Sequence, residues 1–342
     1  MQPRFKPTVY FRQCVGIDIA KSTFMACLSM LDAEGCSTSP IEFTNDRHGF
    51  NQFVRWTRKE SLKGYPLCFV MEPTGVYYEA LAMHLTKLGM TVHVVPANRV
   101  RDFAKYEGYK TKTDKIDAYI LSMLGCENRK LKNWAAPDEQ FASIRSLCRL
   151  RTSLVKHSTM LKNRLGALTV SSFSDKKTVR ICSAALDDID KNIYKAETEI
   201  RNLIDKSEQF KEAVRLSTTI PGIGQTTAAA ILAEVGCFAN FNNHRQVVSF
   251  AGLDVVARQS GPQDPKRHIS KKGNSTIRSM LYICAMSAIR FNPKMREFYD
   301  RIKKSNPSGK VALVAVMRKL LILMYSVCKS KKPYDPEHST KN

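Results

Sequence analysis

Residues 14–31 read CVGIDIAKSTFMACLSML. The run from Cys14 to Ile19 is almost wholly apolar, which is typical of a central strand that is buried on both faces. The run from Thr23 to Met30 is also rich in strand-forming residues, and a short polar turn separates the two runs. We therefore expect an antiparallel hairpin whose first strand lies inside a sheet.

Further strands and helices alternate after this hairpin. Short apolar runs predict strands at Ser39–Thr44, Leu67–Met71 and Thr91–Val95. Between them, His48–Lys59 and Tyr77–Leu88 carry apolar residues at helical spacing. A hairpin followed by alternating helices and strands predicts a mixed α/β sheet.

A different periodicity begins near Phe141. Apolar residues recur there at heptad spacing in two stretches: Leu147, Leu154, Leu161 and Leu168, then Leu186, Ile189, Ile193, Ala196, Ile200 and Leu203. Such seams predict two long antiparallel helices, joined by a loop within 171–178 and paired either in one chain or between protomers. We assign this segment to spacing or oligomerisation rather than to chemistry.

These patterns define a fold class of α/β plus α, with three expected domains. An α/β domain spans 1–138, coiled-coil helices span 139–209, and a mainly helical domain spans 210–342. In the last domain, a long interruption at 252–274 separates the helices, and the apolar run 311–327 predicts a buried helix.

The charge of the chain is strongly positive and unevenly distributed. Its 342 residues contain 54 Lys and Arg against 31 Asp and Glu, a formal net charge of +23. Between Val255 and Lys332 the counts are 18 and 3, a net charge of +15. A region this basic favours a polyanionic partner, and nucleic acid is the commonest one, although a solvated basic surface is the simpler alternative.

Other features argue against export, a membrane and a zinc site. The start, MQPRFKPTVYFRQ, has no apolar core of a signal peptide, and no uninterrupted apolar run reaches the length of a membrane span. The ten cysteines are never closer than nine residues, so no zinc-binding pair exists. We expect a cytoplasmic protein with reduced, structural thiols.

Four acidic residues carry the strongest chemical signal. Asp18 falls within the first apolar strand and Glu72 ends a later one, whereas Asp114 and Asp117 are spaced to share a helical face. A carboxylate in an apolar strand needs compensation, and clustered carboxylates are ligands of Mg²⁺. The alternative is that Asp18 is a turn residue and the other pair belongs to a solvated helix start.

The segment Thr219–Gly224, TIPGIG, resembles the turn of a helix-hairpin-helix. Gly222 and Gly224 precede a helix of small residues, so the turn can present backbone N–H groups to a phosphate. The alternative is a tight interhelical turn that binds no ligand.

A long basic loop follows near the C-terminal end of the chain. It contains Ser260, which taken alone is a turn serine rather than a nucleophile. The nucleic-acid-binding candidates in and after this loop are Arg258, Lys266, Arg267, Lys271, Lys272 and Arg278. The seven histidines show no metal-ligand spacing.

At these residues the sequence resembles a known family, the DEDD transposases of the IS110 group of bacterial insertion sequences, which are bridge-RNA-guided serine recombinases. The resemblance spans nearly the whole chain. Its motifs are, in order, GIDIAKSTF (16–24), EPTGVY (72–77), KTDKIDA (112–118), IPGIG (220–224), FAGL (250–253) with RQSG (258–261), and ISKKGNSTIR (269–278). Any one motif is weak, but six in order are specific.

The resemblance implies an N-terminal domain of the RuvC-like, RNase H type in which Asp18, Glu72, Asp114 and Asp117 bind Mg²⁺. It also implies that Ser260 attacks DNA to form a 5′-phosphoserine intermediate. The family's active site joins the acidic domain of one protomer to the serine of another, within a tetramer. A structured bridge RNA pairs with donor and target DNA and so selects the sites.

Two other functions fit parts of the sequence. A metal-dependent nuclease of the Holliday-junction type would use the four carboxylates and water, and would leave Ser260 idle. A non-catalytic nucleic-acid-binding protein is less compatible with an intact set of four carboxylates. Replacement of the serine separates the first alternative from a transposase.

Overall fold

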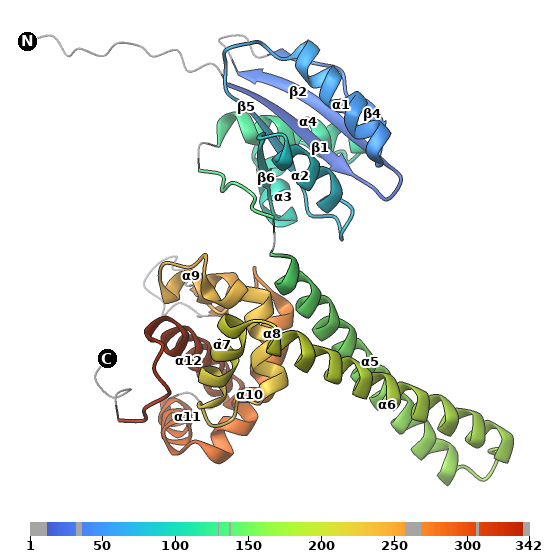
Figure 1. Ribbon diagram of the computed structural model, residues 1–342, viewed down its shortest axis with the longest axis vertical. Helices are drawn as coiled ribbons and strands as arrows, with labels where there is room; N and C mark the ends of the chain where they lie inside the picture. Colours follow the sequence, from blue (N-terminus) through green and yellow to red (C-terminus); the bar gives the residue numbers. More distant parts are fainter. Residues whose placement is uncertain are drawn as a thin grey trace, which may run out of the picture. The chain divides into compact units, whose positions relative to one another are not determined.

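The computed structural model describes residues 12–31, 36–128, 130–136, 138–256, 268–305 and 308–337. The chain divides into two compact units, Met1–Ala136 and Pro137–Asn342 (Figure 1). We describe each unit separately. The predicted division into three domains stays a prediction.

The first unit is built on a mixed sheet. Its strands are β1 (Arg12–Ile19), β2 (Thr23–Leu31), β3 (Cys36–Ser37), β4 (Ile41–Thr44), β5 (Leu67–Met71) and β6 (Thr91–Val94). The order is β3-β2-β1-β5-β6, and β4 also pairs with β2. β1 pairs antiparallel with β2 and parallel with β5, so the expected hairpin and the central position of its first strand are confirmed.

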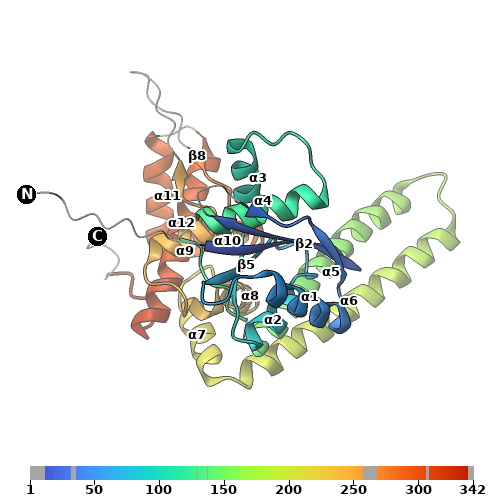
Figure 2. The ribbon, with the colours of Figure 1, turned by 90° about the horizontal axis from the view of Figure 1, so that it is seen from above.

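Helices cover both faces of this sheet (Figure 2). They are α1 (Arg47–Glu60), α2 (Glu79–Lys87), α3 (Ala97–Tyr106) and α4 (Asp114–Glu127). One apolar cluster joins Val15 and Ile17 of β1 to residues of α1 and α2. A second cluster joins Cys14 to residues of α3 and α4, so alternate residues of β1 face opposite layers.

The predicted elements of this unit are confirmed apart from their ends, and two elements were missed. The sequence did not predict β3, which has only two residues, or α3. In α3 only Val100 is buried, and polar residues surround it, so its apolar stripe is too narrow to recognise.

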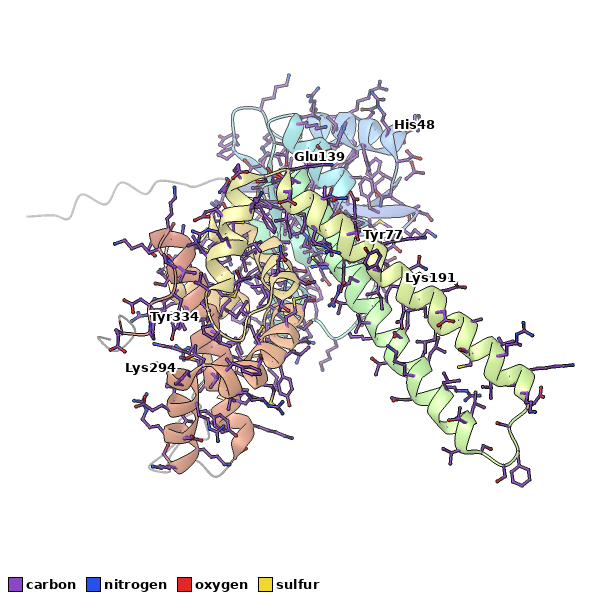
Figure 3. The ribbon with its side chains drawn as sticks, turned by 60° about the horizontal axis from the view of Figure 1, so that its bottom comes forward. His48, Tyr77, Glu139, Lys191, Lys294 and Tyr334 are labelled. Atoms are coloured by element: carbon purple, nitrogen blue, oxygen red, sulfur yellow. The ribbon has the colours of Figure 1, made fainter. Side chains whose placement is uncertain are left out.

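The second unit begins with a helical hairpin. Helices α5 (Glu139–Val170) and α6 (Lys176–Asp205) pack along each other in one chain, as the heptads predicted. Arg151 of α5 bonds Glu197 of α6 at 2.9 Å, and Ser158 bonds Asp190 at 2.7 Å. Many side chains stand out from the hairpin into solvent, Lys191 among them (Figure 3).

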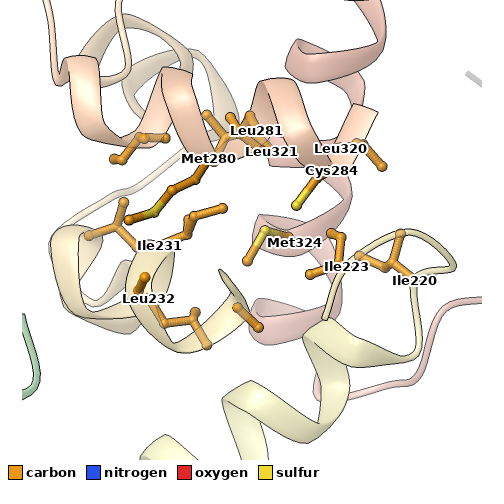
Figure 4. Packing of buried hydrophobic residues seen from close by; sticks show 14 of the residues in the cluster. Ile220, Ile223, Ile231, Leu232, Met280, Leu281, Cys284, Leu320, Leu321 and Met324 are labelled. Carbon is orange, nitrogen blue, oxygen red and sulfur yellow. The ribbon is translucent and has the colours of Figure 1, made fainter. Parts of the chain in front are cut away.

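The rest of the second unit is mainly helical. It contains α7 (Glu208–Thr218), α8 (Gln225–Val235), the short 3-10 helix η1 (Gly236–Phe238), α9 (His244–Phe250), α10 (Ser275–Phe291), α11 (Pro293–Ser305) and α12 (Gly309–Ser330), with the two-residue strands β7 (Val255–Val256) and β8 (His268–Ile269). Ile231 of α8, Met280 of α10 and Met324 of α12 meet in its core (Figure 4).

In the described part of the chain, one helix is long and apolar enough to cross a membrane by length and composition, and it is α12. Nine of its residues, Leu320 and Leu321 among them, are buried in the core of the second unit. Packing inside the protein therefore accounts for its apolar character, as expected for the run 311–327.

Candidate active site

Asp18 and Glu72 lie side by side at one edge of the sheet. In the parallel pairing of β1 with β5, Ile17 lies opposite Met71. Asp18 and Glu72 each follow directly in sequence. Since side chains alternate along a strand, Asp18 shares the face of Gly16, which α4 covers. The strand ends therefore direct two carboxylates toward one helix.

Helix α4 brings the other two carboxylates to the same place. It crosses β1 so closely that a Cβ on Gly16 would lie 2.1 Å from backbone atoms of Ala118 and Ser122. Further along α4, Gly125 packs against Cys14, so the helix runs opposite to β1. Its first turn, which carries Asp114 and Asp117, therefore lies at the end of β1 that holds Asp18.

The sequence also explains where α4 begins. Thr113 caps the helix, with its hydroxyl accepting a hydrogen bond from the backbone N–H of Ile116 at 3.3 Å. The two aspartates of the first turn lie near the positive end of the helix dipole, which favours negative charge. The expectation that they share a helix is confirmed.

The negative charges of the other three acidic residues all act on Asp18. The pKa of Asp18 is raised to about 6, first by burial and then by the negative charges of the other three acidic residues. Burial also raises the pKa of Glu72 and of Asp117. Lys112, whose Nζ lies 3.8 Å from Asp117, opposes all three shifts.

This donor set fits Mg²⁺ in its chemistry, because carboxylate oxygens are the ligands that this ion takes. Within the described ranges, no three His, Cys, Asp or Glu side chains converge closely enough to hold one ion. Bringing these carboxylates to ligand distance requires movement of side chains.

In the second unit, the turn between α7 and α8 has two different glycines. Gly222 has φ 103°, and a Cβ on it would lie 2.6 Å from the backbone of Ala288 in α10. Packing thus explains this residue. Gly224 is exposed, and a Cβ there would meet nothing within 4 Å. It is the N-cap of α8 and provides no side-chain hydrogen bond, so no capping side chain covers the first backbone N–H groups of α8.

A short two-stranded ribbon flanks the basic loop in the sequence. Val255 pairs with Ile269 and Val256 with His268. Below this ribbon, Ser270 bonds the carboxylate of Asp254. Four candidates lie outside the described residues: Arg258, Ser260, Lys266 and Arg267. Their predicted roles stay predictions.

The three remaining basic candidates lie after the ribbon. Lys271 and Lys272 are exposed. Arg278 is half-buried, and its Nη1 donates to the carbonyl oxygens of Ala251 at 2.9 Å and Gly273 at 2.8 Å. This arginine therefore ties together the two chain segments that flank the ribbon, a role that sequence reasoning did not assign to it.

Sequence reasoning also missed a buried polar network centred on Glu234. Glu234 of α8, whose side chain is 3% exposed, accepts two hydrogen bonds from Arg149 of α5, at 2.6 and 2.8 Å. It accepts a third, at 2.8 Å, from Asn274, which caps α10. The signal that could have found it is a single glutamate within the apolar run AAAILAEV (228–235).

The described cysteines form no disulfide. Cys68 differs from most others. Hydrogen bonds from Cys14 and His93 lower its pKa to about 5, against the effect of burial. By contrast, burial raises the pKa of Cys148 to about 12.

The two units together have the features of one class of protein. A carboxylate cluster in an α/β unit, followed by a strongly basic helical unit, is the arrangement expected of an enzyme that acts on nucleic acid.

Comparison with known proteins agrees with this class and narrows it. Residues 15–173 match a family model described as a transposase, and residues 214–300 match the transposase IS116/IS110/IS902 family. The pilin gene-inverting protein of Moraxella bovis is 30% identical over 94% of this chain and 97% of its own. The transposase for insertion sequence element IS1111A of Coxiella burnetii is 25% identical over 81% of this chain and 78% of its own.

The chain belongs to the IS110 family of transposases, so it is an enzyme that acts on DNA in transposition and recombination. A likeness to the crystal structure of an Aquifex aeolicus member of the Ppx/GppA family has 8% identity and a TM-score of 0.22, which is too low to support an argument.

Proposed function

We propose that this transposase excises and inserts its own insertion sequence through a 5′-phosphoserine bond between Ser260 and DNA. Asp18, Glu72, Asp114 and Asp117 would complete the site. The observation that supports this proposal is that two neighbouring strand ends and one helix start carry acidic residues, and that the charges of the other three raise the pKa of Asp18.

The carboxylates of the first unit would hold Mg²⁺, which supplies neutralisation of the attacked phosphate and of the charge that develops there. Asp18 and Glu72 are anchored by neighbouring strands, and Asp114 and Asp117 by the capped start of α4. Lys112 would lose its weak pairing with Asp117 when a cation binds, because both positive charges compete for the same carboxylate.

In the proposed strand cleavage, the Ser260 Oγ–P bond forms and the bond from phosphorus to the 3′ oxygen breaks. The serine's proton ends on the departing 3′ oxygen, so a 3′-hydroxyl and a 5′-phosphoserine result. Rejoining is the reverse reaction with a different 3′-hydroxyl, and the phosphodiester energy is kept in the covalent bond.

The second unit would hold nucleic acid. It contains the strongly basic segment, and Gly224, Lys271 and Lys272 are exposed for contact with phosphates. The family resemblance adds a bridge RNA that selects donor and target DNA, a tetramer whose protomers share active sites, a RuvC-like first unit and a cytoplasmic location. The mixed sheet covered by helices on both faces is compatible with that fold.

The test is to trap the covalent intermediate. Wild-type protein, the RNA of its element, Mg²⁺ and labelled donor and target DNA are run on a denaturing gel beside Ser260→Ala and Asp18→Ala. The controls are Ser305→Ala and Glu42→Gln, which alter exposed residues of the same kinds. We expect a protein–DNA band that only the first two substitutions remove.

Cleavage without a covalent band, surviving Ser260→Ala but abolished by Asp18→Ala, would replace the proposal with a hydrolytic nuclease of the Holliday-junction type. Omission of the RNA tests guidance separately, since a band of equal intensity without it would contradict the RNA-dependent part alone.

A further inference from the structure

Helices α10, α11 and α12 line a cavity of about 390 Å³ that opens to solvent on the second unit. Its walls carry Tyr282 and Arg290 from α10, Arg296, Tyr299 and Lys303 from α11, and Lys310 from α12. None of these residues belongs to the carboxylate cluster, the interhelical turn or the basic loop. The cavity is therefore a separate feature of the molecule.

Positive charge dominates these walls. Four cationic side chains line the cavity against one carboxylate, that of Asp300. Arg296 bonds Asp300 at 3.1 Å, and Lys303 lies 5.9 Å from the centre of the Tyr299 ring. Of the described residues, none forms an ion pair with Arg290 or Lys310, so two cations are left to bind an external anion.

The cavity also offers aromatic and apolar surface. Tyr282 is 51% exposed, whereas Tyr299 is half-buried against the start of α12. Met286 and Leu313 add apolar surface. Free cations beside an open aromatic ring are the combination that binds single strands, because phosphates pair with the cations and a base stacks on the ring.

We propose that this cavity binds an unpaired nucleotide of a DNA strand, with its phosphate at Arg290 and Lys310 and its base against Tyr282. The volume is in the range of small-ligand pockets, so it is large enough for a single nucleotide. DNA is favoured because the family acts on DNA, and strand exchange requires nucleotides that have left their pairs. The inference rests on action on DNA and is independent of Ser260.

The test measures binding of the full-length protein to short labelled oligonucleotides by fluorescence anisotropy. We expect Tyr282→Ala to weaken single-stranded DNA binding roughly tenfold, in the range for loss of one stacked base, and to leave duplex binding within about twofold. Tyr282→Phe keeps the ring and should bind as wild type. Tyr194→Ala is the matched control, because Tyr194 is 67% exposed on α6.

The double substitution of Arg290 and Lys310 by Gln tests the phosphate contacts. It should reduce the salt dependence of single-strand binding by about 0.7 per lost contact. Lys191→Gln combined with Lys195→Gln, on the α5–α6 hairpin, should leave that slope unchanged. A second measurement is photo-crosslinking of 5-iodouracil DNA, which should attach to Tyr282 or Tyr299.

Three results would overturn the inference: an equal loss of duplex binding, a preference for oligoribonucleotides that Tyr282→Ala removes, or a change of oligomeric state in Tyr282→Ala. The last would make the cavity a protein interface. If trapping fails while binding behaves as expected, the serine mechanism is wrong and the cavity stands.

Discussion

The two units of this transposase differ in the amount and the arrangement of their charge. Met1–Ala136 has 19 Lys and Arg against 13 Asp and Glu, whereas Pro137–Asn342 has 35 against 18. In the first unit, backbone packing brings negative charges near Asp18, and their repulsion adds to the effect of burial in raising its pKa. In the second, positive charge is spread over exposed helices, and a buried glutamate is fully paired.

The difference concerns how a site is held in place. The carboxylate cluster depends on close contact between a strand and a helix, which glycines permit. The base of the serine-bearing loop depends on side-chain hydrogen bonds, chiefly those of Glu234 and Arg278. The first site should therefore fail by steric overlap and the second by loss of polar partners.

The largest effect is expected from Gly16→Ala. The new methyl group would meet backbone atoms of Ala118 and Ser122, so α4 must move away from β1, at a cost of about 3 kcal/mol in the free energy of unfolding. Urea unfolding of purified protein measures this loss. Gly166→Ala is the control, since that glycine lies in α5 with nothing within 4 Å, and it should stabilise by up to about 1 kcal/mol. Equal effects would refute the packing argument.

A smaller effect is expected from Glu234→Ala in the second unit. The change removes the carboxylate that Arg149 and the amide of Asn274 both bond, at a cost of about 2 kcal/mol. Hydrogen exchange should rise at 268–274 while the first unit keeps its protection. Glu212→Ala, which removes an exposed partner of Arg215, should leave the stability nearly unchanged. Unchanged exchange at 268–274 would show that the network does not hold the loop base.

Much of the first unit could be predicted from the sequence. Strong apolar runs were sufficient to predict β1, β2, β5 and the buried α12, because burial on both faces leaves little ambiguity. The positions of the four carboxylates followed, since two end strands and two start a helix. Their approach to one another did not, because it depends on Gly16, which sequence reasoning treated as an ordinary strand residue.

Sequence reasoning failed where contacts join distant segments. Glu234 meets Arg149 and Asn274 across three helices, and no local spacing records such a triplet. The cavity of α10–α12 is similar, since Tyr282 and Lys310 lie on separate helices. Conversely, the sequence suggested that Gly222 contacts phosphate, but its close approach to the backbone of Ala288 is sufficient to explain why a glycine stands there.

The charge in the first unit should be measurable as a pH effect. The pKa of Asp18 is raised from 3.8 to about 6 in the folded protein, so folding favours the protonated form. This group's contribution to stability is present below about pH 4 and is lost as pH rises toward 6. Asp18→Asn should therefore stabilise the protein by about 1 kcal/mol at pH 7, after allowance for solvent screening, and by nothing below pH 4.

Thermal unfolding between pH 4 and pH 7 measures the difference in stability between the wild type and Asp18→Asn. Addition of Mg²⁺ provides a second comparison of the two proteins. Millimolar Mg²⁺ should raise the unfolding temperature of the wild type but not of Asp18→Asn, because a ligand that binds only the folded state stabilises it. Asp46→Asn is the control, since Asp46 caps α1 with a lowered pKa and lies outside the cluster. If the difference in stability between the wild type and Asp18→Asn did not change with pH, burial and the neighbouring carboxylates would not destabilise the charged form of Asp18.

The smallest effect concerns reactivity rather than stability. Because hydrogen bonds from Cys14 and His93 lower the pKa of the Cys68 thiol, Cys68 should be alkylated by iodoacetamide before the deeply buried Cys148, whose pKa burial raises. It lines a cavity of about 260 Å³, which gives the reagent access. His93→Gln should slow the reaction several-fold, and mass spectrometry of timed digests follows it. If Cys148 reacted as fast as Cys68, burial in the second unit would not protect the Cys148 thiol, and the predicted order of reactivity would be wrong.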